Sequence, residues 1–113
     1  MNAIYHICTA ADWRAAQEAG QYASASLSKE GFIHCSSRDQ VLRIANTVFR
    51  GQRGLVLLHI DEDHLDAEVR YENCEGGTEP FPHVYGPVSR EAVAQAAKLE
   101  PEPDGTFRWP GER

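Results

Sequence analysis

The sequence has few cysteines and no long hydrophobic run, which excludes two classes of protein. The three cysteines, Cys8, Cys35 and Cys74, include at least one unpaired thiol and show no Cys-x-x-Cys spacing, so no disulfide framework is expected. The longest aliphatic run, Leu55 to Leu58, is far shorter than the roughly 20 residues that cross a membrane. The first residues, 1–6, do not form a basic leader followed by an apolar stretch, so no signal peptide is predicted. We therefore expect a cytoplasmic protein.

Basic residues are also scarce. The chain has 11 Lys and Arg against 17 Asp and Glu, a formal net charge of −6 over 113 residues. Non-specific binding of duplex nucleic acid requires a large positive surface, so that activity is not expected. Neither a Gly-x-Gly-x-x-Gly nor a Walker sequence occurs, which removes the common phosphate-binding loops. The composition is that of an ordinary globular protein, and the length predicts a single domain, 1–113.

The hydrophobic pattern predicts several short strands. The continuous apolar run 55–60 is typical of a central strand covered on both faces, and the alternation in 68–72 is typical of an exposed-face or edge strand. The prolines around 81–84 restrict that segment to an edge or extended position. Further strands are expected at 3–8 and 31–35, and a closing hairpin is expected to pair Leu99 with Phe107 and Trp109.

Three helices are predicted from capping residues that precede apolar residues at helical spacing. One is expected to begin after Thr9 and end at Gly20, and a second to begin after Ser36 or Ser37 and end near Gly51. The third is expected after Ser89, with inward-facing residues at Val93, Ala96 and Ala97. The stretch 22–30 is interpreted as an irregular connection. Together these elements predict an α+β fold, a small mixed or antiparallel domain with about three helices.

Four of the five histidines lie on or beside predicted strands, namely His6, His34, His59 and His83. Strand periodicity places His34 on the same face as Ser36. A half-buried imidazole needs partners for both ring nitrogens, and several such groups are most simply explained if they converge on a site. We therefore predict that His6 and His34 belong to one pocket. The alternative is that each histidine is structural and is satisfied by backbone carbonyls.

The segment Phe81-Pro82-His83-Val84-Tyr85-Gly86-Pro87 is the second unusual feature. Its prolines fix the backbone, Gly86 permits close approach, and His83 and Tyr85 point the same way if the chain is extended. This pattern indicates an aromatic platform with a hydrogen-bonding imidazole for a planar ligand. A prolyl turn that covers the core, tethered by Tyr85, is the alternative interpretation.

Arginines gather in and just after the second predicted helix, at Arg38, Arg43, Arg50 and Arg53. Arg38 stands near the helix start, just after His34, and is the candidate to hold a phosphate through a bidentate contact. Metal binding is a minority hypothesis, because no His-x-x-x-His or Cys-x-x-Cys pair occurs. A nucleophilic role for Cys35 is also disfavoured, since strand neighbours point to opposite faces.

The motifs Ile4-Tyr5-His6-Ile7, Asp12-Trp13, Gly31-Phe32-Ile33-His34-Cys35-Ser36, Ala45-Asn46, Phe49-Arg50-Gly51 and Phe81-Pro82-His83-Val84-Tyr85-Gly86-Pro87 follow one another along nearly the whole chain. In content and order they resemble domain-of-unknown-function family 952. That family in turn resembles the ADP-ribosyltransferase superfamily, whose fold is a split pair of small antiparallel sheets with an NAD cleft between them.

The resemblance implies roles for individual residues. His6 would hold the nicotinamide ribose, and His34, with Ser36 nearby, would pack against the nicotinamide. The superfamily's third motif usually supplies a Glu that orients a ribose hydroxyl. Here that region offers His83 and Tyr85 instead, and Glu79 lies too far from the motif to be assigned, so the chain has no clear catalytic Glu.

We therefore expect a cleft that binds a nucleotide-type ligand, NAD or an ADP-ribose derivative. His34 and His83 are the candidate catalytic residues if the nicotinamide–ribose bond is cleaved. The candidate ligand-binding residues are His6, Ser36, Arg38 and Tyr85. The alternative is a non-catalytic protein-interaction module with structural histidines. That alternative predicts a flat apolar patch around Phe81 and Trp109 in place of an enclosed polar cleft.

Overall fold

The computed structural model describes residues 3–73 and 79–110, so the predictions that concern Cys74 lie outside the described residues. The helices are α1 Ala10–Ala19, α2 Ala25–Glu30 and α3 Arg38–Val48, with single 3-10 turns at Glu62–His64 and Arg90–Ala92. The strands are β1 Ala3–Thr9, β2 Gln21–Tyr22, β3 Ile33–His34, β4 Leu55–Asp61, β5 Glu68–Glu72, β6 Phe81–Tyr85, β7 Val88–Ser89 and β8 Val93–Leu99.

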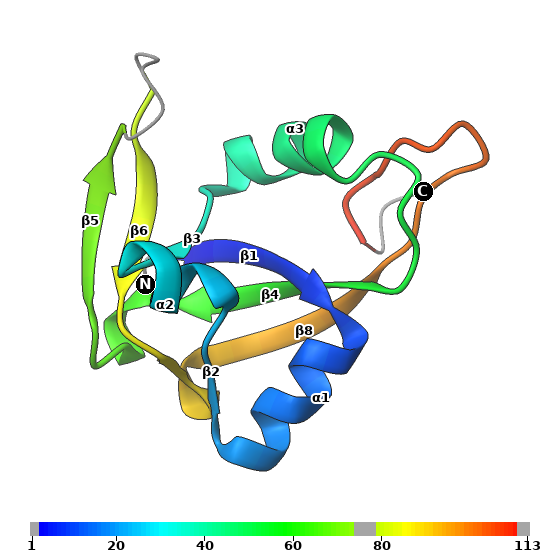
Figure 1. Cartoon of the computed structure of the whole chain (residues 1–113). Helices are drawn as coiled ribbons and strands as arrows, with labels where there is room; N and C mark the ends of the chain where they lie inside the picture. The colour runs from blue at the N-terminus through cyan, green and yellow to red at the C-terminus, as the bar shows by residue number, and fades with distance from the viewer. Residues whose placement is uncertain (1–2, 74–78, 111–113) are drawn as a thin grey trace.

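The strands form three small antiparallel sheets, as expected for the α+β class. One sheet has the order β1-β4-β8, a second has the order β3-β6-β5, and β2 pairs with β7. Tyr5 on β1 also forms a bridge with Ser36, just after β3, through reciprocal backbone hydrogen bonds of 2.7 Å. Figure 1 shows the β5–β6 pair at one side of the β1–β4–β8 sheet and helix α3 above that sheet. The resemblance to the ADP-ribosyltransferase fold stays a prediction.

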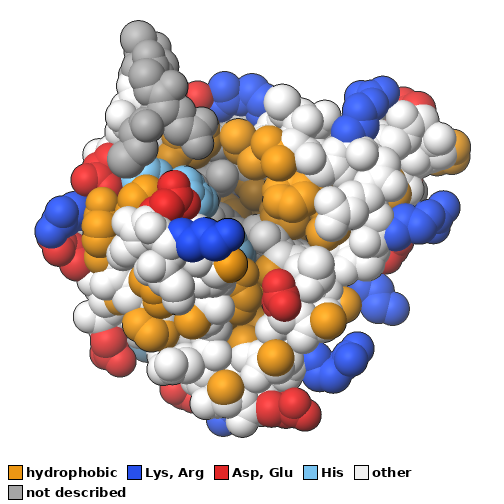
Figure 2. Space-filling model, viewed as in Figure 1, with side chains coloured by type: hydrophobic (Ala, Val, Ile, Leu, Met, Phe, Trp, Pro, Cys, Tyr) orange, Lys and Arg blue, Asp and Glu red, His pale blue; other side chains and the backbone are white. Residues whose placement is uncertain are grey.

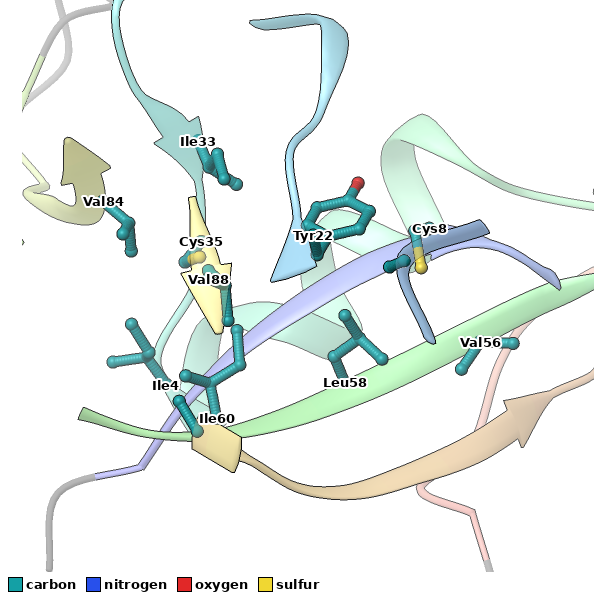
Figure 3. Close-up of a cluster of buried hydrophobic side chains, with 12 residues drawn as sticks. Ile4, Cys8, Tyr22, Ile33, Cys35, Val56, Leu58, Ile60, Val84 and Val88 are labelled. Carbon is teal, nitrogen blue, oxygen red and sulfur yellow. The ribbon is translucent and has the colours of Figure 1, made fainter. Parts of the chain in front are cut away.

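Strand β4 lies at the centre of the protein, which confirms the prediction from its continuous apolar run. It pairs with β1 on one side and β8 on the other. Successive side chains point to opposite faces, so Leu57 joins the cluster beneath α3, while Leu58 joins a cluster on the other face. Figure 3 shows this second cluster, which Ile4, Ile33 and Val84 help to form. The core therefore extends over both faces of the sheet.

The caps of two helices form as the sequence predicts. The Thr9 side chain accepts a hydrogen bond from the backbone N–H of Asp12, and Gly20 ends α1 with a φ of 84°. Ser37 and Gln40 form the capping box of α3. Because α3 is fixed at its start, its buried residues face the sheet over the following turns.

Two predictions in the carboxyl-terminal third are wrong. The helix expected after Ser89 is a 3-10 turn followed by strand β8, in which Ala96 and Ala97 pair with β4. The unpaired edge of β4 takes up this segment, and pairing overrides the helical preference of its alanines. The closing hairpin is also absent, because 100–110 contains turns and no strand in the described part. Phe107 is nevertheless buried, and its backbone N–H donates to Asn46 Oδ1.

Two further expectations need correction. The segment 22–30 contains β2 and α2, where an irregular connection was expected. Strand β6 is central in its sheet, despite Pro82. The N–H and C=O of one residue point to the same side of a strand. The Pro82 carbonyl accepts a hydrogen bond from the Cys35 N–H, so it points to the β3 side of the strand. The Pro82 nitrogen, which carries no hydrogen, therefore also faces that side, where β3 has already ended after His34. The proline therefore costs no ladder bond with β5.

Gly86 provides the close approach that the sequence predicts at the end of β6. A Cβ atom placed on Gly86 would lie 2.8 Å from the Cβ of Ala67, well inside the contact distance of two carbons. We expect Gly86→Ala to lower the free energy of unfolding by about 1–3 kcal/mol, as over-packing does. Combining it with Ala67→Gly should restore most of the loss. Urea unfolding measures both variants, and an undiminished stability of Gly86→Ala alone would contradict the contact.

Candidate functional site

A cavity of about 660 Å³ opens between α3 and the β3–β6–β5 sheet. Figure 2 shows hydrophobic side chains gathered in the upper middle of this face, next to histidine side chains. The apolar residues that line the cavity are Ile7, Cys35, Val41, Ile44, Val48, Phe49 and Phe81. The polar residues that line it are His6, His34, Ser36, Glu72, Asn73, Glu79 and His83. Its volume lies within the range of about 300–1,000 Å³ that is typical of small-molecule sites.

The cavity brings together most of the residues that the sequence singles out. His6, His34, Ser36 and His83 all line it. Tyr85 does not line the cavity itself, although its hydroxyl is bonded to a lining residue, Glu72.

Arg38 is not among the described residues that line the cavity. Its guanidinium lies 4.0 Å from the centre of the Trp109 ring, a cation–π contact. The role of Arg38 in holding a phosphate stays a prediction.

Glu72 is the acidic residue at the centre of the site, and the sequence analysis missed it. The β5–β6 register places Glu72 opposite Phe81 and Arg70 opposite His83, so Glu72 shares a face with His83 and Tyr85. Glu72 Oε1 accepts hydrogen bonds from Tyr85 Oη and from His83 Nδ1 at 3.1 Å. These two donors, Tyr85 first, lower the pKa of the Glu72 carboxyl. Glu72 is therefore an anion held in one position.

The second oxygen of Glu72 is available to a ligand. The hydrogen bonds from His83 and Tyr85 both end on Oε1, and Oε2 has no hydrogen-bond partner within 3–73 and 79–110. The side chain is about one-third exposed, at 31%, and it lines the cavity. A carboxylate whose one oxygen is occupied by internal donors and whose other oxygen is open is a preorganised acceptor.

Aromatic rings pack around His83 behind Glu72. The His83 side chain is 4% exposed and is stacked on Phe32, with 4.2 Å between ring centres and 22° between the planes. His34 meets the His83 ring edge-on at 5.3 Å, because the two residues are directly paired across β3 and β6. This packing fixes the His83 ring, and with it the imidazole nitrogen that donates to Glu72.

His6 is held with both ring nitrogens engaged. Nδ1 lies 2.6 Å from the His34 carbonyl oxygen, and Nε2 lies 2.8 Å from the Tyr22 hydroxyl. Burial lowers the pKa of His6 to about 4, so the ring is neutral at pH 7. Because a carbonyl only accepts, Nδ1 carries the hydrogen, and the Tyr22 hydroxyl donates to Nε2. His6 thus ties β1 to β3 and β2 at the cavity wall.

His34 occupies a more exposed position. Its Nε2 lies 2.8 Å from Glu30 Oε2, and the side chains are 41% and 49% exposed. Glu30 is the last residue of α2, so this hydrogen bond joins the end of that helix to β3. Because the pair is solvated, its net contribution to stability is small.

Glu79 lies on the opposite part of the lining and is paired with a cation. Arg43 donates to both of its carboxylate oxygens, at 2.8 and 2.7 Å, and buried Gln40 donates to Oε2 at 3.1 Å. The Arg43 hydrogen bond, followed by that from Gln40, lowers the pKa of Glu79. Glu72 is the other carboxylate of the lining and has no such arginine partner among the described residues.

Ser36 and Cys35 differ in what they offer to a ligand. Ser36 is 7% exposed, its backbone groups are both bonded to Tyr5, and its hydroxyl has no partner among the residues that the structure describes. The hydroxyl is therefore the polar group that Ser36 can present to the cavity. Burial raises the pKa of Cys35 to about 12, which keeps its thiol protonated and unreactive.

In the described ranges, no group of three or more His, Cys, Asp or Glu could hold a metal ion.

The apolar patch expected for a protein-interaction module is not seen in the described part of the chain. Phe81 lines the cavity, and Trp109 packs edge-on against Tyr5 at 5.3 Å. The large hydrophobic side chains that are exposed there are Val48, at 65%, and Tyr71, at 53%. Across the same residues, no helix is long and apolar enough to span a bilayer.

Comparison with known proteins identifies a family and solved structures of a relative. The family model described as "Protein of unknown function (DUF952)" matches residues 7–96. The crystal structure of protein CC0527 from Caulobacter crescentus is 36% identical with a TM-score of 0.84, over 95% of this chain and 94% of that chain. Its solution NMR structure is 37% identical with a TM-score of 0.82, over 94% and 91%. No curated protein matches.

Proposed function

Since the chain belongs to the DUF952 family, whose description states no function, we propose one from the cavity itself: it binds a nucleotide-type ligand, NAD or an ADP-ribose derivative, by its ribose end. The observation that supports this proposal is Glu72. The sequence resemblance lacked an acidic residue to orient a ribose hydroxyl, and Glu72 lies in the cavity with Oε2 open. A hydroxyl that donates to an anionic acceptor forms one of the stronger neutral–ion hydrogen bonds.

The proposal gives each lining residue a role. Glu72 accepts from a ribose hydroxyl, and the hydroxyl of Ser36 bonds a second polar group of the ligand. His83 and Tyr85 position Glu72, since both donate to its Oε1. His6 positions the backbone of His34, because its own nitrogens are already bonded internally. In this proposal Tyr85 and His6 act through their neighbours, whereas the sequence analysis expects them to contact the ligand directly. Arg38, which does not line the cavity, is given no role.

Cleavage of the nicotinamide–ribose bond is the reaction that this arrangement would favour. The bond breaks with its electron pair on nicotinamide, and water forms the new bond to the ribose carbon and loses a proton to solvent. Positive charge develops on the ribose in this step, and a fixed carboxylate stabilises it without a covalent intermediate. His34 would pack against the leaving base, and His83 would keep Glu72 oriented as the charge develops. Of the two predicted catalytic residues, His34 contacts the leaving base in this scheme, and His83 is a positioning residue that acts through Glu72. NAD is the predicted cofactor or substrate.

A backbone amide NMR titration with NAD, ADP-ribose and nicotinamide tests the proposal. We expect saturable shifts around His34, Ser36 and Glu72. Glu72→Gln should weaken binding at least tenfold, because the amide keeps the shape and loses the charge. Glu68→Gln is the matched control, since Glu68 lies on the same strand and face, pairs with Arg70 and does not line the cavity. Absence of shifts with all three compounds would refute the proposed function.

A further inference from the structure

The cavity differs from a phosphate-binding site in its charge. Neither Lys nor Arg occurs among its described lining residues, whereas Glu72 and Glu79 both do, each with a lowered carboxyl pKa. Arg43 already forms a two-point contact with Glu79, so the negative charge of Glu79 is offset. Arg43 is therefore engaged by Glu79, and the described lining has a net negative character centred on Glu72.

The other positive and titratable groups near Glu72 do not reverse this character. Arg70 shares its sheet face, but the guanidinium lies 4.5 Å from the centre of the Tyr85 ring and is paired with Glu68 at 3.0 Å. His34 is paired with Glu30, and His6 is neutral at pH 7 with both nitrogens used. A phosphate in the cavity would thus meet a carboxylate with no arginine or lysine to bind it.

The opposite wall is apolar and suits a flat ring. Ile44, Val48 and Phe49 contribute it from the end of α3, and Phe81 faces it from the start of β6. Val48 is 65% exposed although it is a large aliphatic side chain, so a ligand that packs there removes apolar surface from water. Between this wall and the Glu72 carboxylate, a positively charged aromatic ring binds more tightly than a neutral one, because solvent only partly screens the anion.

From this arrangement we infer that the cavity selects a planar cation carrying hydroxyl groups, and that it leaves phosphate groups outside. This inference rests on the proposed function and deepens it. Among compounds of the proposed class, the oxidised nicotinamide riboside has these properties: its ring is cationic, its ribose supplies hydroxyls for Glu72 Oε2 and the Ser36 hydroxyl, and it carries no phosphate. The ring lies against the α3 wall, and any phosphates of a longer ligand extend into solvent.

The test compares ligands that share a shape and differ in charge. Oxidised nicotinamide riboside is titrated against its reduced, uncharged form, and against the nicotinamide mononucleotide and NAD, by calorimetry with the full chain. We expect the oxidised riboside to bind at least tenfold tighter than the reduced riboside, and the mononucleotide and NAD to bind no tighter than the oxidised riboside. In Glu72→Gln, the preference for the oxidised form should fall to less than threefold, while Glu68→Gln keeps it.

The outcomes separate this inference from the proposed function. Equal binding of the oxidised and reduced ribosides would overturn the selection of a cation. If the mononucleotide or NAD binds tenfold tighter than the oxidised riboside, the placement of the phosphates outside the cavity is overturned. Binding of ADP-ribose without binding of any nicotinamide compound would support the proposed function and overturn the inference. If none of these compounds binds, the proposed function fails, and the inference fails with it.

Discussion

Replacing Leu58 by alanine is expected to lower the free energy of unfolding by about 4 kcal/mol. Leu58 is 0% exposed on the central strand β4, and its cluster joins residues from β1, β3 and β6, such as Ile4, Ile33 and Val84. Truncation removes the transfer free energy of the buried side chain and leaves a cavity that these strands cannot close. Because β4 pairs on both sides, its backbone cannot move to fill the space.

Urea unfolding followed by circular dichroism measures this loss. Val48→Ala is the control, because Val48 is 65% exposed and packs against little in the folded chain. It should change the free energy of unfolding by no more than about 0.5 kcal/mol. A loss below about 1 kcal/mol in Leu58→Ala would show that this cluster is not the stabilising core.

The elements that the sequence predicts correctly are those with strong local patterns. The run 55–60 has no polar interruption except His59, and it becomes the central strand. The cap at Ser37 followed by residues at helical spacing becomes α3. The segment after Ser89 gives the opposite signal, since its alanines favour a helix, and only the exposed edge of β4 makes it a strand. That information lies about 40 residues away, beyond the reach of any local pattern.

The candidate site is predictable in part for the same reason. His6, His34, Ser36 and His83 stand in short motifs on strands, and the cavity brings them together. The alternation in 68–72 predicts a strand but does not indicate that Glu72 belongs to a site. In the structure, Glu72 lies on the face that His83 and Tyr85 occupy on β6. The alternation in 68–72 and the direction of His83 were both in the sequence. The register that combines them arises only when 68–72 pairs with 81–85, and no local pattern in either segment specifies it.

His6 should make the protein less stable in mild acid. Its pKa is lowered from 6.5 to about 4, first by burial and then by the charge of His34, against the hydrogen bond to the His34 backbone. Between these values the unfolded chain binds a proton that the folded chain does not. The contribution of His6 is therefore complete above pH 6.5 and is lost as the pH falls towards 4. We expect a decrease of about 2–3 kcal/mol between pH 7.5 and pH 4.5.

Two substitutions separate burial from hydrogen bonding as the cause of this pH dependence. His6→Asn removes the titrating group, so the decrease between pH 7.5 and pH 4.5 should largely disappear, alongside lower stability at pH 7.5. Tyr22→Phe removes only the hydroxyl that donates to His6 Nε2 and leaves the ring in its buried place. It should cost about 1 kcal/mol at pH 7.5 and keep the pH dependence, because desolvation is the larger cause. If Tyr22→Phe instead flattens the profile, the hydrogen bond from Tyr22, and not burial, keeps His6 neutral.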